Sequence, residues 1–155
     1  MNENTVELGI RGARAKVEVV GVHGVFYRVR QGGEVLKRRK GKWEIALKGG
    51  GTAKLRARGW VPGFQSLWVD GDRVYRFGTD VPAIAKWLAF LPLTLIAFSA
   101  FVGGIIGILL VFYSLSAIKV PGFPRPLRIA LPVMNTIGGL LIIALVTHGL
   151  RLGGY

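Results

Sequence analysis

Residues 87–118 read WLAFLPLTLIAFSAFVGGIIGILLVFYSLSAI, which is 32 consecutive positions without a charged side chain. Residues 129–150 read IALPVMNTIGGLLIIALVTHGL and form a second uncharged run of 22 residues. A helix that crosses a bilayer needs about 20 predominantly apolar residues. Both runs meet this requirement, so the sequence predicts two transmembrane helices that form a hairpin.

Proline and charged residues mark the ends of the predicted hairpin. Asp80 followed by Pro82 is typical of a helix start, and Pro92 is a point where the first helix can kink. Three prolines in residues 119–126 predict a stiff turn. The expected parts of the chain are a soluble domain (1–80), a juxtamembrane start with the first transmembrane helix (81–118), the turn (119–126), the second transmembrane helix (127–150) and a short tail (151–155).

Trp87 and Tyr113 are the predicted interfacial anchors of the first helix, because Trp and Tyr are enriched at both membrane–water interfaces. They lie 26 positions apart. This spacing corresponds to about 39 Å along an α-helix, close to the thickness of a bilayer with its interfacial regions. We therefore expect one anchor at each interface.

Small residues recur at helical spacing in both apolar runs, as in the series Ser99, Gly103 and Gly107. In lipid, helices associate where small residues let their backbones approach closely. These faces either close the hairpin within one chain or contact another subunit, and the sequence leaves both alternatives open. The predicted helix-packing residues are Ser99, Gly103, Gly104, Gly107, Asn135, Gly138 and Gly139.

The charge of the chain is distributed unevenly along its 155 residues. The formal net charge is +13, and the chain has no cysteine, which excludes a disulfide scaffold and a thiolate metal site. Residues 1–82 hold all eight acidic residues and carry +8, whereas residues 83–155 hold five basic residues and no acidic one. An intramembrane carboxylate is therefore absent, which argues against a proton relay within one chain.

The expected location is the cell membrane, with two spanning helices and both termini in the cytoplasm. Basic residues near the predicted helix ends number four on the terminal side and three in the turn, so they do not set the orientation. The orientation follows instead from size and charge. A soluble domain with a charge of +8 is harder to move across a membrane than a short turn.

Residues 5–78 predict short β-strands that are separated by glycines. Apolar and charged residues alternate with a period of two in residues 42–48 and 53–58. The sequence Asp70-Gly71-Asp72 is typical of a hairpin turn. About seven or eight such strands predict an antiparallel β-sandwich or open barrel. The expected fold class is therefore an α+β membrane protein, in which this β-domain precedes the two-helix hairpin.

Part of the soluble half resembles a known β-domain. The residues concerned are Gly33-Glu34-Val35, Trp43-Glu44-Ile45-Ala46-Leu47, Gly49, Gly63-Phe64 and Leu67-Trp68-Val69-Asp70-Gly71. Their order is similar to the strand repeat of Fas apoptotic inhibitory molecule. The resemblance covers residues 25–77 and implies a β-sandwich, without implying a partner or an activity.

The sequence contains no recognisable catalytic constellation. Its two histidines, His23 and His148, fall in the predicted soluble and membrane parts, so no Ser-His-Asp triad can form. The glycines at 49–51 precede a strand-like segment, whereas a phosphate loop precedes a helix. Asp70 and Asp72 supply too few oxygens for calcium. We therefore expect no enzymatic activity, no catalytic residue, no metal and no cofactor.

Five basic residues occupy six positions in Lys37, Arg38, Arg39, Lys40 and Lys42. This cluster predicts a solvated hairpin end, a contact with anionic headgroups, or a contact with nucleic acid or another acidic partner. A membrane anchor favours headgroups over nucleic acid, because each basic residue near an anionic leaflet contributes about 1 kcal/mol. Nucleic acid is not an expected partner, since neither stacking aromatics nor a reading helix is evident.

Together these features predict a non-catalytic accessory or assembly subunit of a larger membrane complex. Its cytoplasmic basic β-domain would contact a partner protein or anionic headgroups. The alternative is a self-associating protein whose hairpins form a ring or pore, with the soluble domain as sensor or gate. The expected partners are membrane lipids and either other membrane subunits or further copies of the chain.

Overall fold

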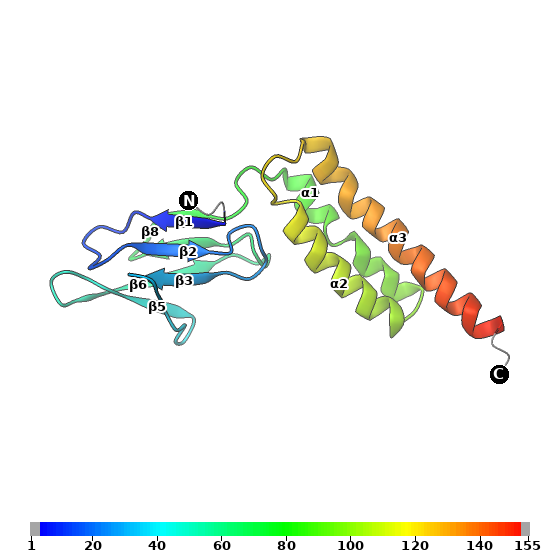
Figure 1. Ribbon diagram of the computed structural model, residues 1–155, viewed down its shortest axis with the longest axis horizontal. Coiled ribbons are helices and arrows are strands. Elements are labelled where there is room, and N and C mark those ends of the chain that lie inside the picture. The colour runs from blue at the N-terminus through cyan, green and yellow to red at the C-terminus, as the bar shows by residue number, and fades with distance from the viewer. Residues whose placement is uncertain (1–3, 153–155) are drawn as a thin grey trace. The chain divides into compact units, whose positions relative to one another are not determined.

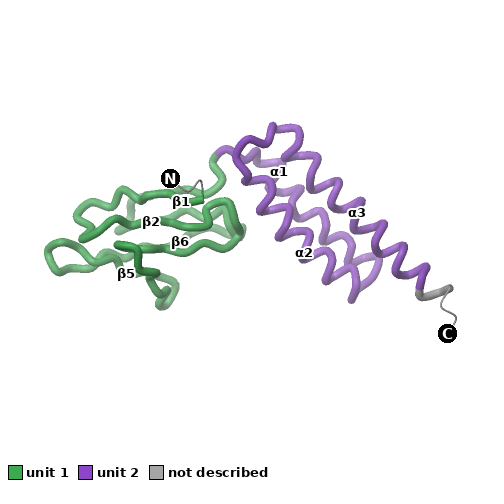
Figure 2. Tube along the Cα trace, in the orientation of Figure 1, with its two compact units in different colours: residues 1–79 green, residues 80–155 purple. Residues whose placement is uncertain are grey.

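The computed structural model describes residues 4–152 and divides the chain into two compact units, Met1–Thr79 and Asp80–Tyr155 (Figure 2). The first consists of β-strands and the second of helices (Figure 1). We call them the β unit and the helical unit.

The β unit contains two antiparallel sheets, each of which is a four-stranded meander in chain order. The antiparallel β-architecture predicted for this half is therefore confirmed. The first sheet contains β1 (Thr5–Leu8), β2 (Val17–Val20), β3 (Arg28–Gln31) and β4 (Glu34–Val35). The second contains β5 (Lys42–Ala46), β6 (Thr52–Arg58), β7 (Ser66–Val69) and β8 (Asp72–Arg76).

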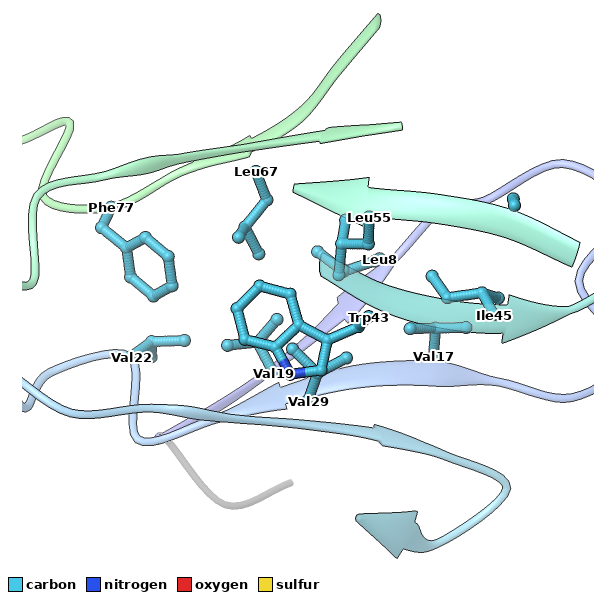
Figure 3. Packing of buried hydrophobic residues seen from close by; sticks show 11 residues of the cluster. Leu8, Val17, Val19, Val22, Val29, Trp43, Ile45, Leu55, Leu67 and Phe77 are labelled. Atoms are coloured by element: carbon cyan, nitrogen blue, oxygen red, sulfur yellow. The ribbon is translucent and has the colours of Figure 1, made fainter. Parts of the chain in front are cut away.

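The apolar residues of the period-two pattern form one core between the two sheets. Trp43 is paired with Leu55 across β5 and β6, and both are buried. Their neighbours in the cluster include Val19 and Val29 of the first sheet (Figure 3). The Gln31 side chain joins the sheets at one edge, because it donates to the Ala46 carbonyl oxygen at 2.7 Å and accepts from the Ala46 N–H at 2.9 Å.

Loops alternate between the two ends of the β unit, since every strand runs antiparallel to its neighbours. The Tyr27 hydroxyl donates to Gln65 Oε1 at 2.9 Å, and the Phe77 N–H donates to the Gln65 carbonyl oxygen at 3.0 Å. The β2–β3 loop, the β6–β7 loop and the segment through which the chain leaves the unit therefore lie together. We call this end, which comprises loops 21–27, 36–41 and 59–65 and segment 77–79, the exit end. The opposite end is the far end.

The first apolar run is not one helix. It forms α1 (Ala83–Leu88), the 3₁₀ helix η1 (Leu91–Ala97) and α2 (Val102–Ala117), and the chain reverses at residues 98–101. Pro92 lies in the first turn of η1, where its missing N–H is tolerated. The reversal places Gly107 beside Pro92 and Gly103 beside Leu95, so η1 and α2 run antiparallel (Figure 1).

The second apolar run forms one long helix, α3 (Arg125–Leu152). Its segment Arg125–Gly149 has a mean hydropathy of 2.2 and, among the described residues, is the single helix that is long and apolar enough to cross a membrane. The predicted two-helix transmembrane hairpin is therefore not confirmed. The connection between α2 and α3 covers residues 118–124, because helical structure resumes at Arg125 and tolerates Pro126 in its first turn.

Candidate functional site

Charge is segregated between the two sheets of the β unit. The strands of the first sheet carry two basic and three acidic residues, whereas those of the second carry six basic and two acidic residues. The register places Lys42, Arg56 and Arg73 in one row, with Trp68 between the two arginines. The Arg58 guanidinium carbon lies 5.2 Å from the centroid of the Trp68 ring. The outer face of the second sheet is therefore basic.

The cluster at residues 37–42 forms a tight turn at the beginning of β5. Arg39 and Lys42 exchange two backbone hydrogen bonds, of 2.8 and 2.9 Å. Lys40 and Gly41 have φ values of 46° and 78°, which is the conformation of a type I′ turn. Lys37, Arg38, Arg39 and Lys40 are exposed, while Lys42 is half-buried. The turn thus displays four of the five predicted cations to solvent.

The basic turn contacts the core of the β unit through Arg38. The Arg38 guanidinium carbon lies 4.9 Å from the centroid of the buried Trp43 ring. Trp43 in turn contacts Tyr27, with ring centroids 5.9 Å apart. Burial raises the pKa of Tyr27, an effect that the charge of Arg38 partly opposes. The basic turn therefore adjoins the Tyr27–Gln65 contact of the exit end.

The loops of the exit end contain several cations and no acidic residue. Its loops and adjoining strand ends (21–28, 36–41, 58–66 and 76–79) contain no Asp or Glu. Three acidic residues lie at the far end, where Asp70 belongs to a turn and Glu34 and Asp72 begin strands β4 and β8. Sequence alone did not indicate this polarity, because it depends on which loops share an end. The exit-end cations are Arg28, Lys37, Arg38, Arg39, Lys40, Arg58 and Arg76.

The Arg128 side chain bonds to two chain segments that are far apart in sequence and meet at one end of the helical unit. We call this end of the unit the head. It donates from Nη1 to the Asp80 carbonyl oxygen at 3.1 Å and from Nη2 to the Val120 carbonyl oxygen at 3.3 Å. The guanidinium is largely buried, and its Nε has no hydrogen-bond partner among the described residues. Lys119 is also buried, and this burial lowers its pKa to about 8.

Trp87 and Tyr113 are both exposed on the helical unit. Trp87 lies on α1, near the head, and Tyr113 lies on α2, four residues before its last residue. Because the chain reverses between them, the expected separation of about 39 Å along one helix is wrong. They belong to the same end of the helical unit, and their role as anchors stays a prediction.

The glycines of the predicted packing faces fall into two groups. A Cβ on Gly103 would overlap the Leu95 carbonyl oxygen, and one on Gly107 would lie 2.7 Å from the Pro92 carbonyl oxygen. Gly139 lies against the side chains of Leu95 and Leu110. These three glycines therefore contact other elements of the same chain. A Cβ on Gly104 or Gly138 would meet nothing within 4 Å.

The two polar members of the packing set have different surroundings. Asn135 on α3 donates from Nδ2 to Ser114 Oγ on α2 at 2.8 Å. Ser99 is half-buried in the segment where the chain reverses between η1 and α2, and its N–H donates to the Leu95 carbonyl oxygen at 3.3 Å. Asn135 thus joins two helices of one chain, which is one of the two alternatives that the sequence leaves open.

Comparisons with protein-family models, with curated proteins and with solved structures found no match to this chain. The resemblance to Fas apoptotic inhibitory molecule therefore stays a prediction. The charge distribution of the chain and its connectivity are the observations that bear on function.

Proposed function

We propose that the chain is a non-catalytic, membrane-anchored accessory subunit whose β unit binds the anionic headgroups of the cytoplasmic leaflet. The observation that carries this proposal is the polarity of the β unit. Seven cations lie at the exit end, whose loops 21–27, 36–41 and 59–65 and segment 77–79 contain no Asp or Glu, and the chain leaves the unit at this same end, immediately before Asp80. Tethered cations of this kind are attracted to an anionic leaflet.

The proposed anchor is a single crossing by α3, accompanied by a re-entrant hairpin. The segments Ala83–Ala97 and Val102–Ala117 are apolar but contain only 15 and 16 residues. Val102–Ala117 extends about 24 Å as an α-helix, which is less than the hydrocarbon core of about 30 Å, and Ala83–Ala97 is divided between α1 and η1. Exposed apolar side chains cover the outer surfaces of α2 and α3, including Ile105, Leu109 and Leu141. Such surfaces are suited to contact with lipid.

We further propose an orientation, which the arrangement of the helical unit supports. The hydrogen bonds of Arg128 place Asp80 and Val120 at the head. Lys86, Lys119 and Arg125 lie in or next to the terminal turns of helices that meet there, whereas Arg151 lies in the last turn of α3. By the positive-inside rule, the head faces the cytoplasm. In this proposal the β unit is cytoplasmic and the C-terminus is on the opposite side, unlike the expectation that both termini share a side.

Vesicle binding by residues 1–79 tests the headgroup contact. We predict that replacing Lys37, Arg39 and Lys40 with Gln weakens binding to anionic vesicles at least tenfold at low salt. Three such charges contribute about 3 kcal/mol before screening. Co-sedimentation measures the affinity, and circular dichroism verifies that each variant is folded.

A matched control changes the same number of charges at the far end. Arg11, Arg14 and Lys48 lie in its loops, so their replacement with Gln lowers the net charge equally. We expect this variant to bind within threefold of the wild type, because the affected charges lie away from the leaflet. Equal losses in the two triple variants, or unchanged binding to purely zwitterionic vesicles, would contradict the proposal.

A further inference from the structure

The exit end also displays two aromatic side chains that headgroup attraction does not explain. Trp60 is 100% exposed and Phe26 is 80% exposed. Trp60 belongs to the β6–β7 loop and Phe26 to the β2–β3 loop, which the Tyr27–Gln65 hydrogen bond connects. Each of these two connected loops therefore exposes a large aromatic side chain, which favours an apolar contact.

The loop that carries Trp60 has a defined backbone conformation. The Phe64 N–H donates to the Val61 carbonyl oxygen at 3.0 Å, and Gly63 has a φ of 76°. With Pro62 at the second position, these features define a type II turn. At the base of the loop, a Cβ on Gly59 would lie 3.0 Å from the Gln65 Cα. The two ends of the loop therefore lie close together, and Trp60 projects from the loop that they enclose.

This loop lies beside the point where the chain leaves the β unit. The Phe64 ring packs so closely on Gly78 that a Cβ there would overlap it. Only residues 79–82 separate Gly78 from the first residue of α1. The Trp60 loop therefore packs against the last residues of the β unit, at its exit end.

We propose that Trp60, assisted by Phe26, inserts into the interface between headgroups and acyl chains of the leaflet that the exit end contacts. The inference rests on the proposed function for the position of the β unit at a membrane. Trp favours this interface, because its ring is apolar and its indole N–H can bond to headgroups or water. The surrounding cations add attraction to anionic lipid, as in interfacial helices that combine both features. The aromatic contact differs from the cationic one because salt does not screen it.

The native fluorescence of Trp60 tests the insertion in the full-length chain. The protein contains four tryptophans, of which Trp43 is buried in the β core and Trp87 is exposed on the helical unit. A Trp87→Phe background removes the exposed helical tryptophan. This protein and its Trp60→Phe derivative are placed in nanodiscs of phosphatidylcholine that contain brominated acyl chains, at high salt. We expect the bromines to quench a component of the emission that Trp60→Phe removes.

Two outcomes would overturn the insertion. One is equal bromine quenching with and without Trp60. The other is acrylamide quenching of Trp60 in nanodiscs that is as strong as the quenching of a free tryptophan peptide in water. That result would mean that the loop stays in water, where it is available to a protein partner. Failure of the headgroup proposal gives a different result. In that case, replacing Lys37, Arg39 and Lys40 with Gln would leave vesicle binding unchanged, while bromine quenching of Trp60 would persist.

Discussion

At the scale of single residues, Lys119 is a cation whose protonation depends on folding. It is 5% exposed, and burial lowers its pKa from 10.5 to about 8. Below pH 8 the ammonium is charged in both the folded and the unfolded state, so folding must desolvate it. Between pH 8 and 10.5 only the unfolded state remains protonated. The unfolded state then binds more protons, and the free energy of unfolding rises with pH.

We predict that Lys119→Met removes the rise in the free energy of unfolding between about pH 8 and 10. The pKa difference corresponds to about 3 kcal/mol as an upper limit. Denaturant titrations in detergent at several pH values measure the effect. Lys119→Arg is the control, because Arg stays charged throughout this range and should give a flat profile. Parallel pH profiles for the wild type and Lys119→Met would refute the assignment.

Some of the exposed residues at the exit end could be recognised from the sequence, and others could not. The cluster at 37–42 was recognisable because its cations are nearly consecutive. The clustering of Arg28, Arg58 and Arg76 with that turn was not, because the three residues are far apart in sequence and share only an end of the β unit. Trp60 carried no sequence signal of exposure, since a lone Trp in a loop is as readily buried as exposed.

At the scale of elements, the strands followed from sequence more completely than the helices. Period-two alternation identified β5 and β6 because one face of each is buried in a core of their own unit. In the first apolar run, every residue is compatible with lipid whether the chain continues or reverses. Hydropathy therefore could not distinguish one long helix from η1 and α2 packed together. The close approach of Gly103 and Gly107 to backbone carbonyls in η1 is specific to the reversed form.

The packing of α2 on η1 predicts different effects on stability for substitutions at two neighbouring glycines. Gly103→Ala should destabilise the helical unit by about 1–3 kcal/mol, because its Cβ would overlap the Leu95 carbonyl oxygen. Gly104→Ala should be neutral or stabilising by up to about 1 kcal/mol, because its Cβ meets nothing within 4 Å and Ala favours helix. Thermal unfolding of both variants in the same detergent measures the difference. Indistinguishable stabilities would count against packing of α2 on η1.

At the scale of the whole molecule, the division of the chain into a charged part and an apolar part was predictable and the connectivity of the apolar part was not. Acidic residues stop at Asp80, and the uncharged runs begin soon after. This division is what the proposed membrane anchor requires, because lipid excludes carboxylates that lack partners. The expected orientation assumed that 119–126 lay across the membrane from Asp80. In the structure Arg128 joins the carbonyls of Asp80 and Val120, which places the turn at the end of the helical unit where the chain enters it.

Cysteine labelling tests this connectivity most directly, because the chain contains no native cysteine. Single cysteines at Lys48 in the β unit, at Val120 in the α2–α3 connection and after Tyr155 are treated with a membrane-impermeant maleimide in sealed vesicles of one orientation. A single crossing by α3 predicts that positions 48 and 120 react from the same side and that the C-terminal cysteine reacts from the other. If position 48 and the C-terminal cysteine react from the same side and position 120 reacts from the opposite side, the chain forms a two-helix transmembrane hairpin, and the single crossing is contradicted.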